Sequence, residues 1–219
     1  MKHLFLTSSV HAVARDIARG VNLSKGKRLV FIDTAAEPET GDKTWLKNDR
    51  QALVDAGFEV KDYTITGKEK AQLAKDLAPF DFIYLSGGHT PYLLLQSQQS
   101  GFVSVIQEFI LKKGKIYIDT SAGSIIAGPK LPLYLLEDNE DFKPEDSRGF
   151  GFVNFTILPH WGSENFRDKY LNNRMDIVYT LDQVPLLLLT DNQYVHVRDD
   201  RIEVVDTTNR KISSGSVVV

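Results

Sequence analysis

Short apolar runs that alternate with amphipathic segments are the feature of this sequence that most constrains its fold. Runs such as Leu29–Ile32 and Leu186–Leu189 are apolar at every position, which is typical of strands covered on both faces. Strands are predicted at residues 3–6, 28–32, 58–63, 82–85, 115–118, 152–158 and 185–189. Helices are predicted at residues 10–21, 44–56, 68–77, 91–99, 102–112 and 164–179. Strands joined by such helices need crossover connections, so we predict a mostly parallel sheet with helices on both faces.

The end of the chain has a different pattern, in which polar and apolar residues alternate. From Gln193 onward this alternation surrounds the acidic pair Asp199-Asp200, which predicts an antiparallel hairpin or meander at an edge of the sheet. The sequence contains no repeat and no Pro/Gly-rich linker, and the acidic stretch 137–148 is too short to separate domains. We therefore predict one α/β domain over residues 1–219, a three-layer sandwich with a mostly parallel central sheet and a C-terminal antiparallel hairpin.

The composition is that of an ordinary globular protein. The 219 residues are 42% hydrophobic and 25% charged, which is enough to bury one sizeable core. The net charge of −3 gives no attraction to nucleic acid or to an anionic membrane. No apolar run approaches the roughly 18 residues that span a bilayer. The chain has no cysteine, which excludes disulfides, thiolate metal sites and a cysteine nucleophile, and we expect a cytoplasmic protein.

No motif in the sequence indicates a metal ion or a nucleotide. The five histidines include no H-E-x-x-H pair. The segment at residues 87–94, "GGHTPYLL", matches neither a Walker loop nor a G-x-G-x-x-G fingerprint. We therefore expect no cofactor, no metal, no nucleic-acid partner and no membrane partner.

Polar groups and glycines follow four of the predicted strands, at the point where each strand ends. They are the pair Gly87-Gly88, Ser121, His160 and Asp191. In an open parallel sheet, ligands bind beyond the carboxyl ends of the strands, so these groups share one edge if their strands are parallel neighbours. A hydroxyl, backbone donors, an imidazole and a carboxylate are the parts of a serine hydrolase.

Each of these residues also has a simpler interpretation. Ser121 can be a turn or helix-cap residue, the glycines a permissive loop, His160 a structural histidine and Asp191 a turn residue. Ser121 is favoured as a nucleophile because small residues follow it directly and let a helix start pack under the turn. The four groups together favour catalysis more than any one of them does.

The segments "YLSGGHTPYLL", "DTSAGSIIAG" and "ILPHW", in this order, resemble the dipeptidase E (aspartyl dipeptidase) family of serine peptidases. The resemblance runs from the first strand to about Asp191. It implies a class I glutamine amidotransferase-like (flavodoxin-like) fold, and that family is also related to cyanophycinases. By motif, the resemblance implies that Ser121 is the nucleophile and His160 the general base. It also implies that the backbone N–H groups of Gly88 and Ala122 form the oxyanion hole.

The family's third catalytic residue is a carboxylate after a late strand, which corresponds to Asp191, although a glutamate is often found there. Glu137 or Asp138, between the serine and the histidine, is an alternative orienter of His160. The chain departs from the family at Asp119, where the elbow usually begins with glycine, and a larger residue could alter the turn or narrow the pocket.

Substrate recognition is the second departure, because the family carries an Arg-containing segment after its histidine that binds an aspartyl carboxylate. The candidates in this chain are Arg167, Lys169 and Arg174. We expect a serine peptidase that acts on short peptides with an N-terminal Asp, as a monomer or small homo-oligomer. The alternatives are a non-catalytic binding protein of the same fold, with its elbow spoiled by Asp119, and a cyanophycinase-like hydrolase of another amide.

Overall fold

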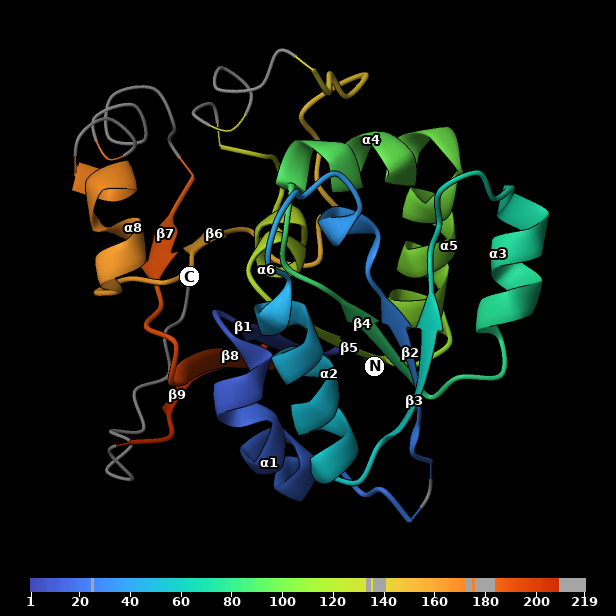
Figure 1. The fold of residues 1–219 in the computed structure, drawn as a ribbon. Helices are drawn as coiled ribbons and strands as arrows, with labels where there is room; N and C mark the ends of the chain where they lie inside the picture. The colour runs from blue at the N-terminus through green and yellow to red at the C-terminus, as the bar shows by residue number, and fades with distance from the viewer. Residues whose placement is uncertain (25, 133–134, 136–140, 172–174, 176–183, 209–219) are drawn as a thin grey trace.

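The computed structural model describes residues 1–24, 26–132, 135, 141–171, 175 and 184–208 (Figure 1). Its centre is a seven-stranded sheet with the strand order β3-β2-β4-β5-β1-β8-β9. The first five strands in this order run parallel, and β8 and β9 are antiparallel. The strands are β1 His3–Thr7, β2 Arg28–Ile32, β3 Glu59–Tyr63, β4 Phe82–Leu85, β5 Ile116–Asp119, β8 Gln193–Arg198 and β9 Arg201–Asp206.

Helices cover both faces of this sheet, so the predicted three-layer sandwich is confirmed (Figure 1). One face packs on α1 and α2, and the other packs on α3, α4, α5 and α6. Successive residues of β1 point to opposite faces: Phe5 belongs to the α1/α2 core, and Leu4 and Leu6 belong to the other. The helices are α1 Val10–Gly20, η1 Thr34–Ala36, α2 Thr44–Asp55, α3 Lys70–Leu77, α4 Thr90–Gln99, α5 Phe102–Gln107 continued by η2 Glu108–Lys112, α6 Ala122–Ile126 and α8 Glu164–Lys169.

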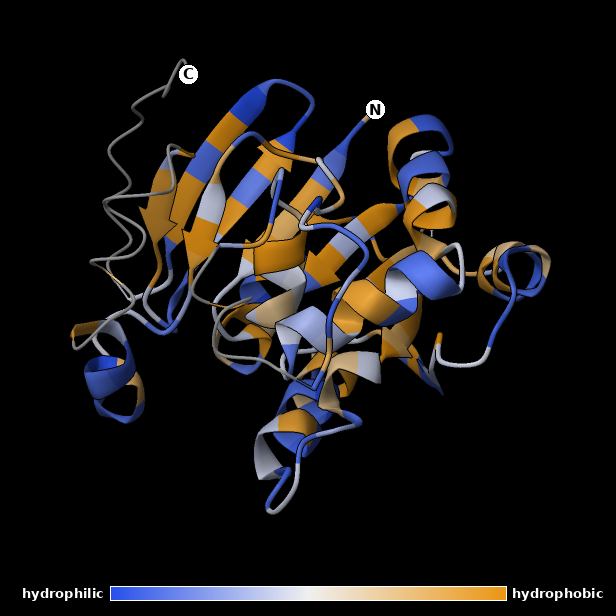
Figure 2. Ribbon diagram, turned by 90° about the horizontal axis from the view of Figure 1, so that it is seen from above, coloured by the Kyte–Doolittle hydropathy of each residue, from blue (hydrophilic) through white to orange (hydrophobic). Residues whose placement is uncertain are grey.

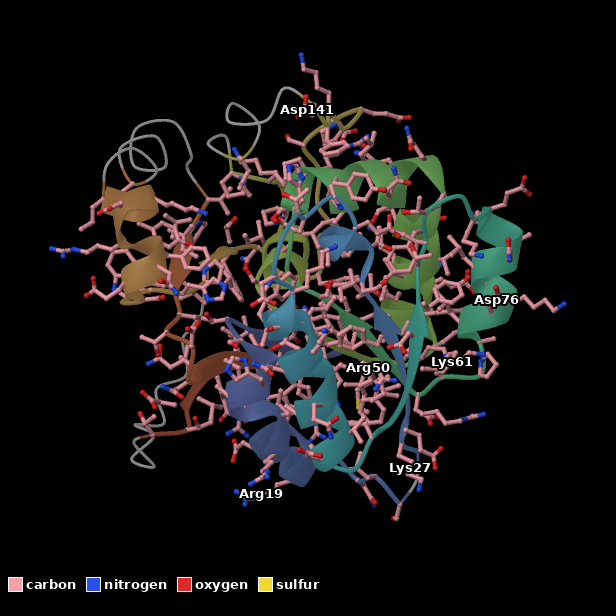
Figure 3. The ribbon with its side chains drawn as sticks, viewed as in Figure 1. Arg19, Lys27, Arg50, Lys61, Asp76 and Asp141 are labelled. Atoms are coloured by element: carbon pink, nitrogen blue, oxygen red, sulfur yellow. The ribbon has the colours of Figure 1, made fainter. Side chains whose placement is uncertain are left out.

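Each helix carries both apolar and polar residues, as Figure 2 shows by hydropathy. In α1, for example, Val10, Val13, Ala14 and Ile17 are buried, whereas Arg19 is exposed. Charged side chains such as Arg19, Lys61 and Asp141 lie on the outside of the fold (Figure 3). This arrangement is the one expected when an amphipathic helix buries one stripe against a sheet.

The last two predicted parallel strands do not join the central sheet, which corrects the expectation of a single sheet. They are shorter than predicted, β6 Thr156–Leu158 and β7 Leu186–Leu188, and pair in parallel with each other in a separate two-stranded sheet. Residues 152–155, predicted as strand, are not a strand. The Phe150 and Phe152 N–H groups donate to the carbonyls of Ile126 and Ala127 at the end of α6, so this backbone follows α6 instead of pairing with a strand.

The C-terminal hairpin is confirmed. Strands β8 and β9 pair antiparallel about the Asp199-Asp200 turn, where Asp199 has a φ of 53°. Strand β8 also pairs antiparallel with β1, so the hairpin extends one edge of the parallel sheet. The helix predicted over 164–179 begins at Glu164 as α8; residues 172–174 and 176–179 of that prediction lie outside the described residues.

Candidate active site

Ser121 occupies a strained turn between β5 and α6. Its φ of 51° and ψ of −97° lie far from the regions that side-chain-bearing residues favour. The backbone is held on both sides, because Ser121 N–H donates to Thr7 O at 3.0 Å and Ser121 O accepts from Ile125 N–H at 3.0 Å. No described residue forms a hydrogen bond with its hydroxyl. A tightly held turn that projects an unengaged serine between a strand and a helix has the geometry of a nucleophile elbow.

The small residues behind Ser121 allow this turn. A Cβ on Gly123 would lie 2.7 Å from Asp119 Cβ and 2.8 Å from Leu85 O, so a side chain there would collide with the elbow and with β4. Ala122 is completely buried beside it. The sequence interpretation of these residues as a close-packed helix start agrees with this geometry.

Asp119 lies beneath the elbow and is completely buried. Its Oδ1 accepts hydrogen bonds from Thr7 N–H at 2.7 Å and from the Ser124 hydroxyl at 2.5 Å. Burial raises the pKa of the Asp119 carboxyl well above its ordinary range, because a buried position disfavours the charged form. Asp119 therefore joins the start of α6 to the end of β1 from inside the fold, and its side chain does not project into an open site.

The Gly87-Gly88 loop lies directly beside the serine. A Cβ on Gly87 would be 3.5 Å from Ser121 Cβ, and Gly88 has a φ of 127°. A Cβ on Gly88 would lie 2.3 Å from Ala35 O, so only glycine fits this position. Among the described residues, no acceptor is hydrogen-bonded to the N–H of Gly88 or of Ala122. These two donors are in the part of the site where an oxyanion hole would be needed.

His160 and Asp191 are brought together by the small β6/β7 sheet. Each follows one of its parallel strands, and His160 Nδ1 lies 2.7 Å from Asp191 Oδ1. The hydrogen bond to His160 lowers the pKa of Asp191, which keeps this carboxylate ionised. The imidazole stacks on the ring of Phe166 with 4.3 Å between centroids. His160 itself has a φ of 60°, another strained conformation. Ser121 Oγ and His160 are not hydrogen-bonded to each other.

Ser8 joins this pair to the central sheet, and the sequence interpretation missed it. The Ser8 hydroxyl oxygen accepts from His160 N–H at 2.7 Å and donates its hydrogen to Asp191 Oδ1 at 2.7 Å. Ser8 directly follows Thr7, whose carbonyl accepts from Ser121 N–H. His160 and Asp191 thus lie at the same sheet edge as Ser121. The signal was available in the sequence, since Ser8 follows the apolar run of β1 just as the other four groups follow theirs.

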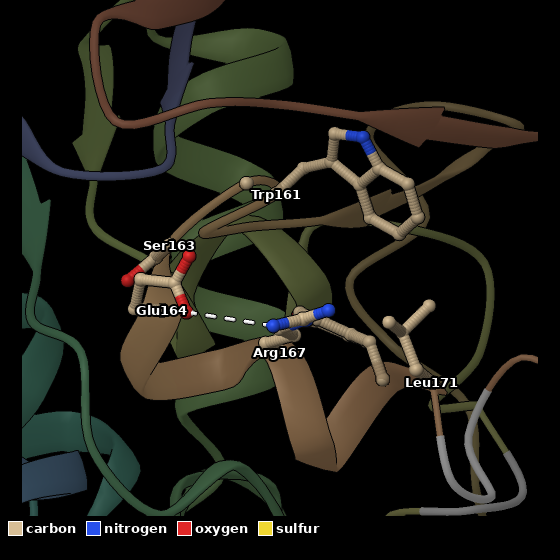
Figure 4. Close-up of a pocket in the computed structure, with 7 residues that line it drawn as sticks. Trp161, Ser163, Glu164, Arg167 and Leu171 are labelled. Atoms are coloured by element: carbon tan, nitrogen blue, oxygen red, sulfur yellow. Dashed lines mark ion pairs between the residues drawn. The ribbon is translucent and has the colours of Figure 1, made fainter.

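The candidate recognition residues are placed only in part. Arg167 lines a pocket of about 260 Å³ together with Trp161, Tyr170 and Leu171 (Figure 4), and Trp161 directly follows His160 in the chain. Its guanidinium lies 4.0 Å from the carboxylate of Glu164, and both side chains are exposed. Lys169 lies 5.2 Å above the ring of Phe166. The third recognition candidate, Arg174, and the two alternative orienters, Glu137 and Asp138, lie outside the described residues.

The described part of the chain has no group of three or more His, Asp or Glu side chains arranged to hold a metal ion. None of its described helices has the length and apolar character needed to cross a membrane.

Comparison with known proteins gives one family for nearly the whole chain. The model of peptidase family S51 matches residues 4–205. The chain is 31% identical over 166 residues to an uncharacterized peptidase of Pasteurella multocida, covering 74% of this chain and 78% of that protein. It is 24% identical over 168 residues to a Drosophila melanogaster protein named as a probable alpha-aspartyl dipeptidase, covering 74% of this chain and 67% of that protein.

The fold comparison agrees. The crystal structure of a Listeria monocytogenes protein, assigned provisionally to peptidase E, matches with a TM-score of 0.81 and 26% identity, covering 94% of this chain and 98% of that one. The resemblance inferred from the elbow, glycine-pair and histidine motifs is therefore confirmed. The chain belongs to peptidase family S51.

Proposed function

We propose that this protein is a serine peptidase that hydrolyses short peptides, with Ser121 as nucleophile, His160 as general base and Asp191 as orienter. The observation that carries the proposal is the strained, doubly anchored backbone of Ser121 at the edge where the His160–Asp191 pair lies. Family membership supports the reaction class. A strained residue persists only where its surroundings over-determine it, and such sites are commonly catalytic.

The proposed reaction begins with attack of Ser121 Oγ on the peptide carbonyl. Because an ionised carboxylate can only accept, the hydrogen of His160 lies on Nδ1 toward Asp191, and Nε2 is free to take the serine proton. The imidazolium then gives this proton to the leaving amine, and water releases the acyl group by the same steps in reverse. In the unliganded protein the serine and histidine are not hydrogen-bonded, as is common before substrate tightens the site.

The developing oxyanion would bind the N–H groups of Gly88 and Ala122. Each such donor typically contributes about 3 kcal/mol to transition-state stabilisation. The positive φ of Gly88 and its close approach to Ala35 hold that N–H in place without any side chain, so the donor needs no reorganisation during the reaction.

The proposed substrate is a short peptide with an acidic N-terminal residue. Arg167 lines the pocket beside Trp161, and its pairing with Glu164 at 4.0 Å is a weak, exposed one that a substrate carboxylate can replace. A charge-assisted hydrogen bond from a guanidinium to a carboxylate is strong enough to select such a side chain. The name of the Drosophila relative supports the same substrate class.

The test combines labelling and turnover. We expect a fluorophosphonate probe to label the wild-type protein, because only an activated serine reacts, and Asp-Leu to be cleaved. Ser121→Ala should abolish labelling, and Ser121→Ala and His160→Ala should each lower kcat by roughly 10⁴-fold or more with unchanged thermal unfolding. Ser104→Ala, at an exposed serine of α5, is the matched control. An unlabelled, inactive wild type would favour the non-catalytic alternative, and full activity of Ser121→Ala would remove the nucleophile assignment.

A further inference from the structure

The proposed catalytic groups belong to two different sheets, which raises the question of what aligns them. Ser121 follows β5 of the central sheet, whereas His160 and Asp191 follow β6 and β7 of the small sheet. No ladder of backbone hydrogen bonds joins the two sheets. Apolar side chains such as Ile157 and Leu189 pack the small sheet against the core, but apolar packing has little directionality. Alignment of a base with its nucleophile needs directional contacts.

Ser8 supplies such contacts from the end of β1. Its side chain is completely buried, and its single oxygen lies 2.7 Å from His160 N and 2.7 Å from Asp191 Oδ1. Since the backbone N–H can only donate and the ionised carboxylate can only accept, the roles are fixed: Ser8 Oγ accepts from His160 and donates to Asp191. One hydroxyl therefore holds the backbone of the base and the side chain of its orienter.

Both ends of this bridge matter to the proposed reaction. His160 has a φ of 60°, and its N–H is held by Ser8 in that strained conformation. Asp191 Oδ1 receives two hydrogen bonds, from His160 Nδ1–H and from Ser8, which fix the carboxylate oxygen against the imidazole. Ser8 also contributes to the lowered pKa of Asp191, because its hydroxyl stabilises the ionised form.

We propose that Ser8 is a positioning residue for the reaction, which locks the His160–Asp191 pair of the small sheet to the edge of the central sheet that carries Ser121. This inference rests on the proposed serine peptidase function. The Ser8 hydroxyl also lies 3.4 Å from His160 Nδ1, the imidazole nitrogen that faces Asp191, so Ser8 acts through the base and the orienter. Its neighbour Ser9 is also buried, but the Ser9 hydroxyl contacts His11 at 2.8 Å and neither member of the pair.

Ser8→Ala leaves His160 N–H without its acceptor and removes one of the two hydrogen bonds to Asp191 Oδ1. We expect kcat on Asp-Leu to fall about 10- to 100-fold with little change in KM, since each of these bonds involves a charged or buried group. Ser9→Ala is the matched control and should stay within about threefold of wild type. Because Ser8→Ala can fail to fold, Ser8→Cys serves as a second variant; it replaces the oxygen with a larger sulfur that forms only weak hydrogen bonds, and it should also lose kcat.

The energetic coupling between Ser8 and Asp191, measured by a double-mutant cycle on activity, distinguishes positioning from a general structural role. We expect Ser8→Ala to cost little further activity in an Asp191→Asn background, since both changes break the same arrangement. In the proton NMR spectrum, the low-field resonance of the His160 Nδ1 proton, assigned by its loss in His160→Ala, should shift or broaden in Ser8→Ala and not in Ser9→Ala.

The possible outcomes distinguish failure of the proposed Ser8 role from failure of the proposed serine peptidase function. Full activity of Ser121→Ala and Asp191→Asn would overturn the proposed triad. Collapse of those two variants together with wild-type kcat and an unchanged Nδ1 resonance in folded Ser8→Ala or Ser8→Cys would overturn the role of Ser8 alone. Equal losses in Ser8→Ala with and without Asp191→Asn would overturn the claim that Ser8 positions the orienter, because the loss would then not pass through Asp191.

Discussion

The two sides of the candidate active site differ in burial and in charge. The central-sheet side, defined by Gly87-Gly88 and residues 119–124, is mostly buried, and burial raises the pKa of its one carboxyl, Asp119, well above the ordinary range. The small-sheet side, defined by residues 160–171 and Asp191, carries charge and is partly open; 42% of the Asp191 side chain is exposed, and no residue of α8 is buried. We therefore expect the central-sheet side to act through the geometry of its backbone and the small-sheet side to act through its charged side chains.

This difference predicts which amino-acid substitutions each side should tolerate. A group that acts by shape is sensitive to added atoms, whereas a group that acts by charge is sensitive to neutralisation at constant shape. Asp191 and Asp119 permit a direct comparison, because the same isosteric substitution to Asn can be made on each side.

The largest effect is expected for Asp191→Asn on the small-sheet side. The amide keeps the shape, removes the charge that stabilises the imidazolium, and favours the wrong tautomer of His160, so kcat should fall by about 10⁴-fold while the protein stays folded. The measurement is kcat on Asp-Leu with thermal unfolding alongside. Asp200→Asn, in the exposed hairpin turn, is the control. If Glu137→Gln were the crippled variant and Asp191→Asn active, the orienter would be misassigned and the triad otherwise retained.

The next largest effect is expected for Gly88→Ala on the central-sheet side. The added methyl would sit 2.3 Å from Ala35 O, so the loop must shift and carry its N–H away from the position of the oxyanion. Loss of one such donor should lower kcat by about 10²- to 10³-fold with a smaller change in KM. Gly20→Ala is the control, because a Cβ there meets nothing within 4 Å. Wild-type kcat in Gly88→Ala would show that this side does not act through its backbone shape.

An intermediate effect, on binding instead of rate, is expected for Arg167→Ala. Loss of a guanidinium–carboxylate contact at a half-open site should raise KM for Asp-Leu about tenfold and leave Ala-Leu unchanged. Lys169→Ala is the matched control, since Lys169 lies on the same helix over Phe166 and does not line the pocket. Equal turnover of Asp-Leu and Ala-Leu by the wild-type protein would contradict acidic specificity altogether.

The pattern of apolar residues predicted the central sheet more accurately than the segment that leads into the small sheet. The strands of the parallel core were predicted to within a residue or two, and those covered on both faces, such as β4, are apolar throughout. The run at 152–158 is also mostly apolar, but its first part packs as irregular chain hydrogen-bonded to the end of α6. An apolar pattern reports burial, and burial alone does not specify a strand.

The candidate site was predictable where a group follows an apolar run, as Ser121, His160 and Asp191 do. The contacts of Ser8 and Asp119 were not, because they depend on β1 lying beside β5 and on a small sheet docking at the end of β1. Such neighbours are far apart in the sequence, and a local pattern does not encode which distant segments pair. The recognition residues were the least predictable, since exposed cations on a short helix leave no pattern of burial.

The smallest effect on activity is expected for Asp119→Asn, on the central-sheet side. Asn keeps an oxygen that can accept from Thr7 N–H and from the Ser124 hydroxyl, and it is uncharged, as burial favours at this position. We expect kcat to stay within about threefold of wild type, in contrast to the same substitution at Asp191. A loss comparable to that of Asp191→Asn would mean that charge, and not shape, acts beneath the elbow, and the comparison of the two sides would fail.

The raised pKa of Asp119 should nevertheless be visible in the pH dependence of the free energy of unfolding. Burial raises its pKa well above the ordinary 3.8, so above about pH 4 the folded protein keeps a proton that the unfolded chain releases. The folded state then binds more protons than the unfolded state, and this group's contribution to the free energy of unfolding declines as pH rises toward the folded pKa. Asp119→Asn lacks this titration, so its free energy of unfolding, relative to wild type, should increase in urea titrations as the pH rises above about 4. Asp200→Asn should show no such trend, and a difference between Asp119→Asn and wild type that is constant across this range would mean that Asp119 is ionised in the folded protein.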